Sequence, residues 1–424
     1  MKILVLGSGA REHAIILALR GEATPHEVLA APGNAGIARD ADNVDVDSLS
    51  PAAVTAFALD HAVDLVVIGP EAPLVAGVAD ALREHGIPVF GPGKAAAQLE
   101  GSKAFAKRVM DAAGVPTGRA IRAHDEAQLA AALDELGAPH VVKADGLAAG
   151  KGVLVTEDRA AALAHGASYL ASGPVLVEEF LAGPEVSLFF LADGDTVRPL
   201  SPAQDFKRAF DGDAGPNTGG MGAYSPLPWL DERFGSEEAF VDEVTRTVAE
   251  PVVRQLDSDG TPFIGLLYAG LILTDDGIKV IEFNARFGDP ETQVVLPRLL
   301  DPLSGLLLAA ASGTLEDTPR PAFADACAVT VVLASEGYPE APVTGRPISG
   351  VDAAESAAGV HVAHAATAQD ASGSLSATGG RVLNVVALGS SFHEARSRAY
   401  DALGRIELPG GHYRRDIAAR VDEG

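Results

Sequence analysis

The first hundred residues alternate short apolar segments with amphipathic ones, and this order most limits the folds that the chain can adopt. Residues 2–6, 28–30, 65–68 and 89–90 have the apolar character of buried strands, and residues 11–20 have the period of a helix. Strands that alternate with helices form an open parallel sheet with helices on its faces. The sequence therefore predicts an α/β domain built on a parallel sheet at the N-terminus.

Glycine-containing turns follow three of these strands, at residues 7–13, 31–36 and 69–74. The carboxyl ends of parallel strands meet at one edge of a sheet, where ligands bind, so the turns are candidates for a ligand site. The first turn lacks the third glycine of a dinucleotide-binding GxGxxG segment. It therefore favours another anion, held by backbone N–H groups and Arg11, over NAD or FAD.

Composition limits the size, the partners and the compartment of the protein. The 424 residues, 47% of them hydrophobic, suffice for roughly three domains of about 100 to 200 residues each. A formal net charge of -26 excludes nucleic acid as a partner, whereas a small, metal-neutralised phosphate ligand is compatible with it. Cys327 is the only cysteine, which excludes an internal disulfide framework. No apolar run reaches the roughly 18 residues of a membrane helix, and we expect a cytoplasmic protein without a membrane partner.

A glycine-rich hairpin is predicted in the middle of the chain. A strand ends at Lys143, and Gly146, Gly150, Lys151 and Gly152 follow in the loop before a returning strand. Glycines let the backbone approach phosphate oxygens closely, and lysines add positive charge. The order differs from a Walker loop, in which a helix follows the glycines. The segment indicates a phosphate-binding hairpin, with a plain flexible hairpin as the alternative.

An acidic connector then joins two apolar strands. It contains Glu178, Glu179, Leu181 and Glu185. A connector of this kind can offer main-chain groups to an adenine edge and a carboxylate to ribose hydroxyls. The alternative is a solvated sheet edge.

The strand near residue 280 carries polar side chains at every second position. Glu282, Asn284 and Arg286 emerge on one face, because successive strand side chains alternate between faces. Carboxylate and amide oxygens suit a hard divalent cation, and a neighbouring arginine can hold phosphate oxygens. The strand therefore predicts the floor of a metal–nucleotide site, against an ordinary half-exposed strand.

Other segments are less specific. Residues 216–226 are rich in glycine and predict a long ordered loop, which in a compact domain is usually functional. Residues 328–334 and 381–388 predict strands of a C-terminal domain, residues 391–403 predict its closing helix, and residues 363–373 predict a polar loop.

Taken together, these segments resemble the ATP-grasp ligases, and the match to the phosphoribosylamine–glycine ligase family runs over the whole chain. It rests on residues 7–13, 31–36, 69–74, 217–225 and 286–293 as well as on the hairpin and the connector. The resemblance implies a Rossmann-like parallel-sheet domain at 1–102, an ATP-grasp clamp at 103–325 with a lid at about 120–190, and a C-terminal α+β domain at 326–424.

The resemblance also implies a reaction. The carboxylate of glycine would take the γ-phosphate of ATP to give glycyl phosphate, and the amine of 5-phosphoribosylamine would then displace phosphate to give glycinamide ribonucleotide in purine biosynthesis. Glu282 and Asn284 would hold Mg2+ or Mn2+. Lys103 and Lys143 would contact the ATP phosphates, and the glycine loop would close over them.

The remaining roles implied by the resemblance divide between two substrates. Arg286 would stabilise the transferring phosphoryl group or the glycine carboxylate. The residues expected around glycine and the acyl phosphate are Asp205, Lys207, Arg208 and Asp289; those expected on the phosphoribosylamine side are Gly9, Arg11, Asn34 and Glu71. One departure from the family pattern is Phe206, which stands where a histidine is common and removes a titratable group.

Three other functions remain open at this point. The chain could be another ATP-grasp carboxylate–amine ligase, a nicotinamide oxidoreductase, or a nucleotide sensor without turnover. The intact set of Glu282, Asn284 and Arg286 disfavours the sensor. The sequence has no conspicuous apolar seam, and we expect a monomer that binds small molecules.

Overall fold

In the computed structural model, which describes residues 1–146 and 152–422, the chain begins with a parallel sheet of five strands in the order β3-β2-β1-β4-β5. The strands are β1 (Lys2–Gly7), β2 (Glu27–Pro32), β3 (Asp42–Asn43), β4 (Leu65–Ile68) and β5 (Val89–Phe90). The predicted parallel sheet is confirmed, with β3 as a strand that the sequence pattern did not indicate.

Both faces of this sheet are buried, as a parallel sheet requires. Ile3 and Val5 pack on one face with side chains of α1 (Ala10–Arg20), whereas Leu4 and Leu6 pack on the other with side chains of α2 (Pro51–Asp60) and α4 (Val78–Glu84). The helix α13 (Leu303–Ser312) adds leucines to the α1 side. A segment 300 residues along the chain thus completes the N-terminal core.

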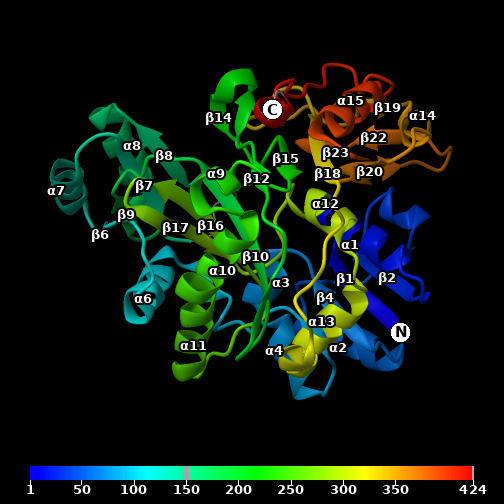
Figure 1. The fold of residues 1–424 in the computed structure, drawn as a ribbon, viewed down its shortest axis with the longest axis horizontal. Helices are drawn as coiled ribbons and strands as arrows, with labels where there is room; N and C mark the ends of the chain where they lie inside the picture. The colour runs from blue at the N-terminus through cyan, green and yellow to red at the C-terminus, as the bar shows by residue number, and fades with distance from the viewer. Residues whose placement is uncertain (147–151, 423–424) are drawn as a thin grey trace.

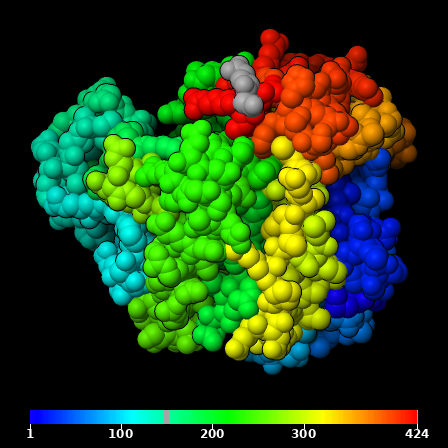
Figure 2. Space-filling view, viewed as in Figure 1, coloured from blue at the N-terminus to red at the C-terminus, as the bar shows by residue number. Residues whose placement is uncertain are grey.

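The region predicted as a lid, which keeps that name below, contains a small antiparallel sheet with its own core. Its strands run in the order β6-β9-β7-β8, and α7 (Glu126–Leu136) and α8 (Arg159–Leu170) pack on it. The strands are β6 (Ala120–Ala123), β7 (His140–Ala144), β8 (Val153–Thr156) and β9 (Val175–Glu178). It forms a separate lobe at the left of Figure 1, and Figure 2 shows this lobe projecting from the body of the molecule.

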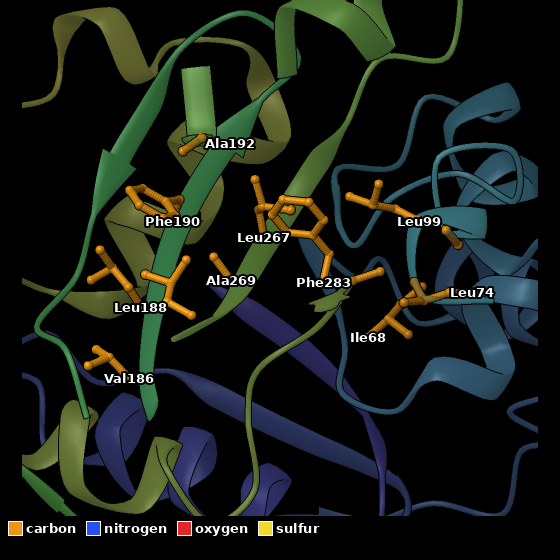
Figure 3. Close-up of a cluster of buried hydrophobic side chains, with 14 of the residues drawn as sticks. Ile68, Leu74, Leu99, Val186, Leu188, Phe190, Ala192, Leu267, Ala269 and Phe283 are labelled. Atoms are coloured by element: carbon orange, nitrogen blue, oxygen red, sulfur yellow. The ribbon is translucent and has the colours of Figure 1, made fainter. Parts of the chain in front are cut away.

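The central sheet has the order β11-β10-β16-β17 and carries the predicted polar strand at one edge. Its strands are β10 (Glu185–Asp193), β11 (Val197–Pro199), β16 (Ile264–Thr274) and β17 (Gly277–Asn284). Figure 3 shows the Phe283 ring beside Leu267 of this sheet, and Leu74 and Leu99 of the preceding region belong to the same buried cluster. This shared core sets β17 against the N-terminal part of the chain.

The C-terminal sheet takes strands from two distant parts of the chain. Its order is β12-β15-β18-β23-β20, with β12 (Gln204–Asp205), β15 (Gly222–Ser225), β18 (Cys327–Ala334), β20 (Val360–His364) and β23 (Arg381–Gly389). The prediction of a long loop over residues 216–226 was therefore wrong in part, because β15 is buried and pairs with β18. In Figure 1 this sheet lies beside the N-terminal region, away from the lid.

The polar loop predicted at residues 363–373 was also wrong. This segment contains the end of β20 and the strand β21 (Thr367–Gln369), which pairs with β22 (Leu375–Ala377) beside β19 (Pro347–Ile348). The closing helix is confirmed as α15 (Phe392–Leu403), with Ser391 as its N-cap.

Shorter elements complete the fold. The helical segments are η1 (Ile37–Arg39), α3 (Glu71–Ala76), α5 (Gln98–Gly101), α6 (Lys103–Ala113), η2 (Asp211–Asp213), α9 (Leu230–Phe234), α10 (Glu237–Val244), η3 (Thr245–Ala249), α11 (Glu250–Ser258), α12 (Thr292–Val295), η4 (Leu296–Arg298), η5 (Leu315–Asp317), α14 (Val351–Glu355) and α16 (Ala419–Asp422), and the strands β13 (Arg208–Phe210) and β14 (Ala214–Asn217) form a hairpin. Among the described helices, none combines the length and the apolar character needed to cross a bilayer.

Candidate active site

The end of β17 places Glu282 among positive charges. Burial raises the pKa of the Glu282 carboxyl, but Lys207, Lys143 and Lys103 lower it by more, so the pKa lies below its ordinary value. Within the described part of the chain, no hydrogen bond or ion pair uses this carboxylate. Glu282 is thus an ionised group whose oxygens are available to a ligand.

Arg286 lies just beyond the strand and is held by several acceptors. Its Nη2 is 3.0 Å from Glu100 Oε1 and 3.3 Å from Asn284 Oδ1, its Nη1 donates to the Phe287 carbonyl at 3.1 Å, and its Nε is 3.9 Å from Glu71 Oε2. Burial lowers the pKa of Arg286, but the carboxylates of Glu100 and Glu71 raise it above its ordinary value. The predicted set of Glu282, Asn284 and Arg286 therefore lies together, with Glu71 beside it.

Glu100 is a member of the site that sequence reasoning missed. It is buried at the end of α5, and its Oε2 accepts the Ala285 N–H at 2.8 Å. Burial raises the pKa of its carboxyl, while Arg286 opposes the rise. An acidic residue before a helix gives no local signal of such a pairing, because its partner is 186 positions further along the chain.

Lysines from the lid and from α6 converge on Glu178. Lys143 Nζ is 3.0 Å from Glu178 Oε2, and Lys107 Nζ is 3.2 Å from the same oxygen. Lys143 also donates to the Ile281 carbonyl at 3.4 Å, which connects the lid to β17. Lys107 was missed by the sequence analysis. Glu178 thus binds lysines, whereas the neighbouring Glu179 accepts the Arg119 N–H at 3.1 Å and lies at the exposed end of the connector.

The start of the glycine loop is fastened to α6. Lys103 Nζ donates to the Gly146 carbonyl at 3.3 Å, and the Ala144 N–H donates to the Gly152 carbonyl at 2.8 Å. Burial lowers the pKa of Lys103, although Glu282 opposes this. Gly150 and Lys151, which were predicted to bind phosphates, lie outside the described residues.

Asp205 and Lys207 face the same region from the C-terminal side. Lys207 Nζ is 2.5 Å from Glu185 Oε2, and Glu185 begins β10. Burial raises the pKa of Asp205 to about 7, against the lowering effect of Lys207. Arg208, predicted in the same group, instead donates to the Gly215 carbonyl at 2.8 Å within the β13–β14 hairpin. Leu181 lies apart from them, against the backbone of Gly118.

A buried carboxylate, Glu291, lies behind this group and was not predicted. Its Oε1 accepts the hydroxyls of Tyr268 at 3.0 Å and Ser187 at 3.2 Å. The Glu291 carboxylate helps to raise the pKa values of Asp205 and Tyr268. The one signal of Glu291 in the sequence was its position two residues after Asp289, within the segment 286–293 on which the family resemblance rests.

The first N-terminal turn binds an anion, but that anion is Glu12 of the same chain. The Gly9 N–H donates to Glu12 Oε2 at 2.6 Å, and Arg11 Nε donates to Glu12 Oε1 at 2.6 Å. Cβ atoms on Gly7, Gly9 or Gly69 would each come closer than 3.0 Å to the Glu12 side chain. Glycines at these positions are therefore required by Glu12, which corrects the prediction that the turn presents its N–H groups to a ligand.

We expect Gly69→Ala to destabilise the fold by about 1–3 kcal/mol, since the added methyl group overpacks the Glu12 side chain at a position without a left-handed backbone. Gly305→Ala in α13 is the matched control, because a Cβ there meets nothing within 4 Å and alanine favours a helix. Urea unfolding midpoints measure both. Equal midpoints for the two variants would contradict the packing around Glu12.

Arg11 and Asn34, two predicted substrate residues, connect parts of the chain. Arg11 Nη1 donates to the Phe287 carbonyl at 3.2 Å, next to Arg286. Asn34 Nδ2 donates to the Ser8 carbonyl at 2.9 Å and to the His364 carbonyl at 2.8 Å, and its Oδ1 accepts two backbone N–H groups. The amide of Asn34 is thus occupied by the protein, where it joins the N-terminal turn to β20.

Asp289 is held by an arginine from the C-terminal sheet. Arg381 Nη2 is 3.0 Å from Asp289 Oδ2, and Arg381 Nη1 donates to the Asp289 and Gly219 carbonyls. Burial raises the pKa of Asp289, but Arg381 and Arg11 lower it by more. Asp289 is therefore an ionised group at the meeting point of the three regions.

Among the residues that the structure describes, no three or more His, Cys, Asp or Glu side chains are arranged to hold a metal ion. A cation at Glu282 and Asn284 would therefore need further oxygens, such as those of a nucleotide phosphate.

Comparison with protein families identifies all three regions. Models described as the phosphoribosylglycinamide synthetase N domain, ATP-grasp (A) domain and C domain match residues 1–100, 101–292 and 328–420.

Curated relatives and solved structures agree with these models. The phosphoribosylamine–glycine ligase of Leifsonia xyli subsp. xyli is 70% identical over 99% of this chain and 100% of the relative, and that of Streptomyces coelicolor is 58% identical over 99% of each. The crystal structure of phosphoribosylamine–glycine ligase from Thermotoga maritima is similar with a TM-score of 0.81 at 33% identity, covering 98% of this chain and 100% of that one.

The biotin carboxylase domain of 2-oxoglutarate carboxylase from Hydrogenobacter thermophilus, with a TM-score of 0.68 at 18% identity over 97% of this chain and 91% of that one, shares the fold. By these matches over its full length, the chain belongs to the phosphoribosylglycinamide synthetase family.

Proposed function

We propose that this protein ligates glycine to 5-phosphoribosylamine with ATP and releases glycinamide ribonucleotide, ADP and phosphate, the second step of de novo purine synthesis. The observation that carries the proposal is Glu282 on β17, whose charge is influenced by Arg286 and the three lysines 103, 143 and 207, with Lys143 bonded to the Ile281 carbonyl and Arg286 to Asn284. Positive groups around a single free carboxylate suit a metal-bound triphosphate.

The donor set around Glu282 fits a divalent cation. Its carboxylate is ionised and free of protein partners among the described residues, and Asn284 adds an amide oxygen on the same face. Both are hard oxygen ligands. Glu282 and Asn284 would hold Mg2+ or Mn2+, which supplies countercharge for the phosphates of ATP when bound.

In the first step, an oxygen of the glycine carboxylate attacks the γ-phosphorus of ATP, and the bond to ADP breaks. Lys143 and Lys103 would bind the phosphates, and Arg286 would stabilise the charge on the transferring group. The ion pair between Lys143 and Glu178 and the contact of Lys143 with the Ile281 carbonyl would keep the lid lysine over β17.

In the second step, the amine of phosphoribosylamine attacks the acyl carbon of glycyl phosphate, and phosphate leaves. The amine must lose a proton as the amide forms. We assign Asp205 as the acceptor, since burial raises its pKa to about 7 and a base of that pKa is ionised and effective near neutral pH. Lys207 would bind the acyl phosphate, Asp289 would help to shape the glycine region, and the turns of the N-terminal sheet would face phosphoribosylamine.

The three regions receive separate roles in this proposal. Residues 1–102 form the phosphoribosylamine side, residues 103–325 the ATP-grasp clamp with its lid, and residues 326–424 the C-terminal part. Connections through Arg11, Asn34 and Arg381 support a single site shared between them. We also propose that the protein acts in the cytoplasm and as a monomer.

The function is tested by ADP release with ATP and Mg2+, after glycine and freshly prepared phosphoribosylamine are added separately and together. Release should require both substrates and should fail when alanine replaces glycine. ADP release without phosphoribosylamine, or with another phosphorylated amine in its place, would assign the protein to a different ATP-grasp reaction.

Dinucleotide binding is the weaker alternative. At the first N-terminal turn the Gly9 N–H is already bonded to the Glu12 carboxylate, so it is not free to hold a pyrophosphate. An NADH fluorescence titration should therefore show no binding.

Asp205 predicts a pH dependence. Because its pKa is raised to about 7, it carries a proton below that pH and cannot accept another, so kcat/KM for phosphoribosylamine should rise as pH increases through about 7. The sign for stability is opposite: the folded state binds this proton more tightly, so this contribution to stability is lost between about pH 4 and pH 7.

The matched variant is Asp205→Asn, in which the acidic limb of the rate profile should disappear together with most of the activity. An acidic limb that persists unchanged in Asp205→Asn would assign it to another group.

A further inference from the structure

The segment that follows α15 returns to the β13–β14 hairpin and binds it through several polar contacts. The Arg415 N–H donates to Asp211 Oδ1 at 2.7 Å, and the Gly212 N–H donates to Asp416 Oδ2 at 2.8 Å. The Ile417 side chain occupies the space that a Cβ on Gly222 would need. Residues 415–417 are therefore fitted against the part of the chain that follows Asp205 and Lys207.

Arg414 is the centre of this contact. Its side chain is 1% exposed, and its Nε and Nη2 form a bidentate pair with Asp416 at 2.8 Å and 2.7 Å. Its Nη1 is 2.8 Å from Asp213 Oδ1 and donates to the Arg208 carbonyl at 3.2 Å. Its guanidinium carbon lies 4.9 Å from the centre of the Phe206 ring. A buried arginine with this many partners has a single position.

Along the chain, Phe206 and Arg208 alternate with Asp205 and Lys207, the residues that face the active site. Lys207 lies near Glu185, Asp205 and Glu282, whereas Phe206 lies against Arg414 on the opposite side of the backbone. The Phe206 N–H and carbonyl are both bonded to the strand at Met221 and Gly222, so the backbone here cannot move independently of its neighbour. A shift of Phe206 would therefore shift Lys207.

We propose that Arg414 is a positioning residue for the glycine side of the active site, holding Phe206 and the Arg208 carbonyl from behind so that Lys207 and Asp205 keep their places. This inference rests on the proposed function for the identity of the substrate. The Arg414 guanidinium is attracted to the face of the Phe206 ring, which stands where the family commonly has a histidine. Because the guanidinium is planar, it can stack on this ring while its N–H groups donate hydrogen bonds to other partners.

The matched control is Arg396. It binds the same segment through its backbone, with Nε donating to the Ile417 carbonyl at 3.1 Å and Nη2 to the Arg415 carbonyl at 2.7 Å. It also contacts Tyr400 and Asp422, and none of its hydrogen bonds, ion pairs or ring contacts within the described part of the chain involves Phe206 or Arg208. Arg396→Met therefore loosens the C-terminal segment without removing the support behind Lys207.

The experiment measures steady-state kinetics and melting temperatures for three variants in the full chain. Arg414→Met should lower kcat/KM for glycine about 10- to 100-fold, the scale of a misplacement of about 1 Å, and leave KM for ATP within about twofold. Arg396→Met should leave both constants near the parent values. Phe206→Leu keeps the ion pairs of Arg414 and removes the ring, and it should show the same glycine effect if Arg414→Met fails to fold.

A readout that needs no turnover is the position of Lys207 itself. Reductive 13C-methylation of lysines gives a resonance that Lys207→Arg identifies by its loss. It should shift in Arg414→Met and in Phe206→Leu but not in Arg396→Met. An unmoved Lys207 resonance, or equal losses for glycine and ATP, would overturn the positioning role. A parent enzyme without ADP release would overturn the proposed function while the resonance still tests the positioning.

Discussion

Glu282→Gln should lower turnover by about 10²-fold or more and leave the fold intact, because the amide keeps the shape of the side chain but loses the charge that a phosphate-bound cation requires. The loss should appear in kcat, and the Mg2+ concentration needed for half-maximal rate should rise. The lysines around Glu282 would lose their central anion, so binding of free ATP without metal should tighten. ADP release across a Mg2+ series and ATP titration without metal measure these effects.

Asp276→Asn is the control for this change. Asp276 is exposed in the turn between β16 and β17. The substitution therefore removes one negative charge from the same hairpin, at the end away from the site. Its kinetics should match the parent enzyme. Near-normal turnover in folded Glu282→Gln would refute its assignment as a metal ligand.

Arg286→Met should reduce both turnover and stability. Turnover should fall by about 10²-fold or more because the transferring phosphoryl group loses a countercharge. The fold should lose about 3 kcal/mol, since Glu100 is buried and would lose the partner that lies 3.0 Å away. Part of this loss should be recovered at low pH, where Glu100 takes up a proton.

The double variant Arg286→Met/Glu100→Gln separates the two effects. Removing the charge of Glu100 should restore most of the stability, while turnover stays as low as in Arg286→Met. Denaturant unfolding and ADP release measure the two quantities in the same preparations. Recovery of turnover in the double variant would show that Arg286 acts only as a partner of Glu100.

Local patterns in the sequence predicted the elements whose stability is local. The strand predicted at residues 65–68 is β4, and the closing helix predicted at residues 391–403 is α15 (Phe392–Leu403), because apolar periodicity and a capping residue decide them. The strand β15 was predicted as part of a loop. Its glycine-rich sequence has no strand signal of its own, and it is formed by pairing with β18 about a hundred residues later.

The candidate site shows the same division. The sequence could group Glu282 with Asn284 and Arg286, because the first two lie on the strand β17 and Arg286 follows two residues after its end. Glu100 and Lys107 could not be grouped with them, because each pairs with a residue far along the chain and burial alone decides the pairing. The role of Gly7, Gly9 and Gly69 was mistaken for a related reason: a glycine needed for packing around a side chain gives the same pattern as one needed by a phosphate.

The C-terminal sheet has a consequence for how the protein is made. The strand β15 ends at Ser225, and its partner β18 begins at Cys327, 102 positions later. At a synthesis rate of about 5–20 residues per second, β15 leaves the ribosome about 5–20 s before any part of β18 exists to pair with it. During that interval a nascent chain presents an unpaired strand edge, so slow translation through this segment should make the newly made protein dependent on chaperones.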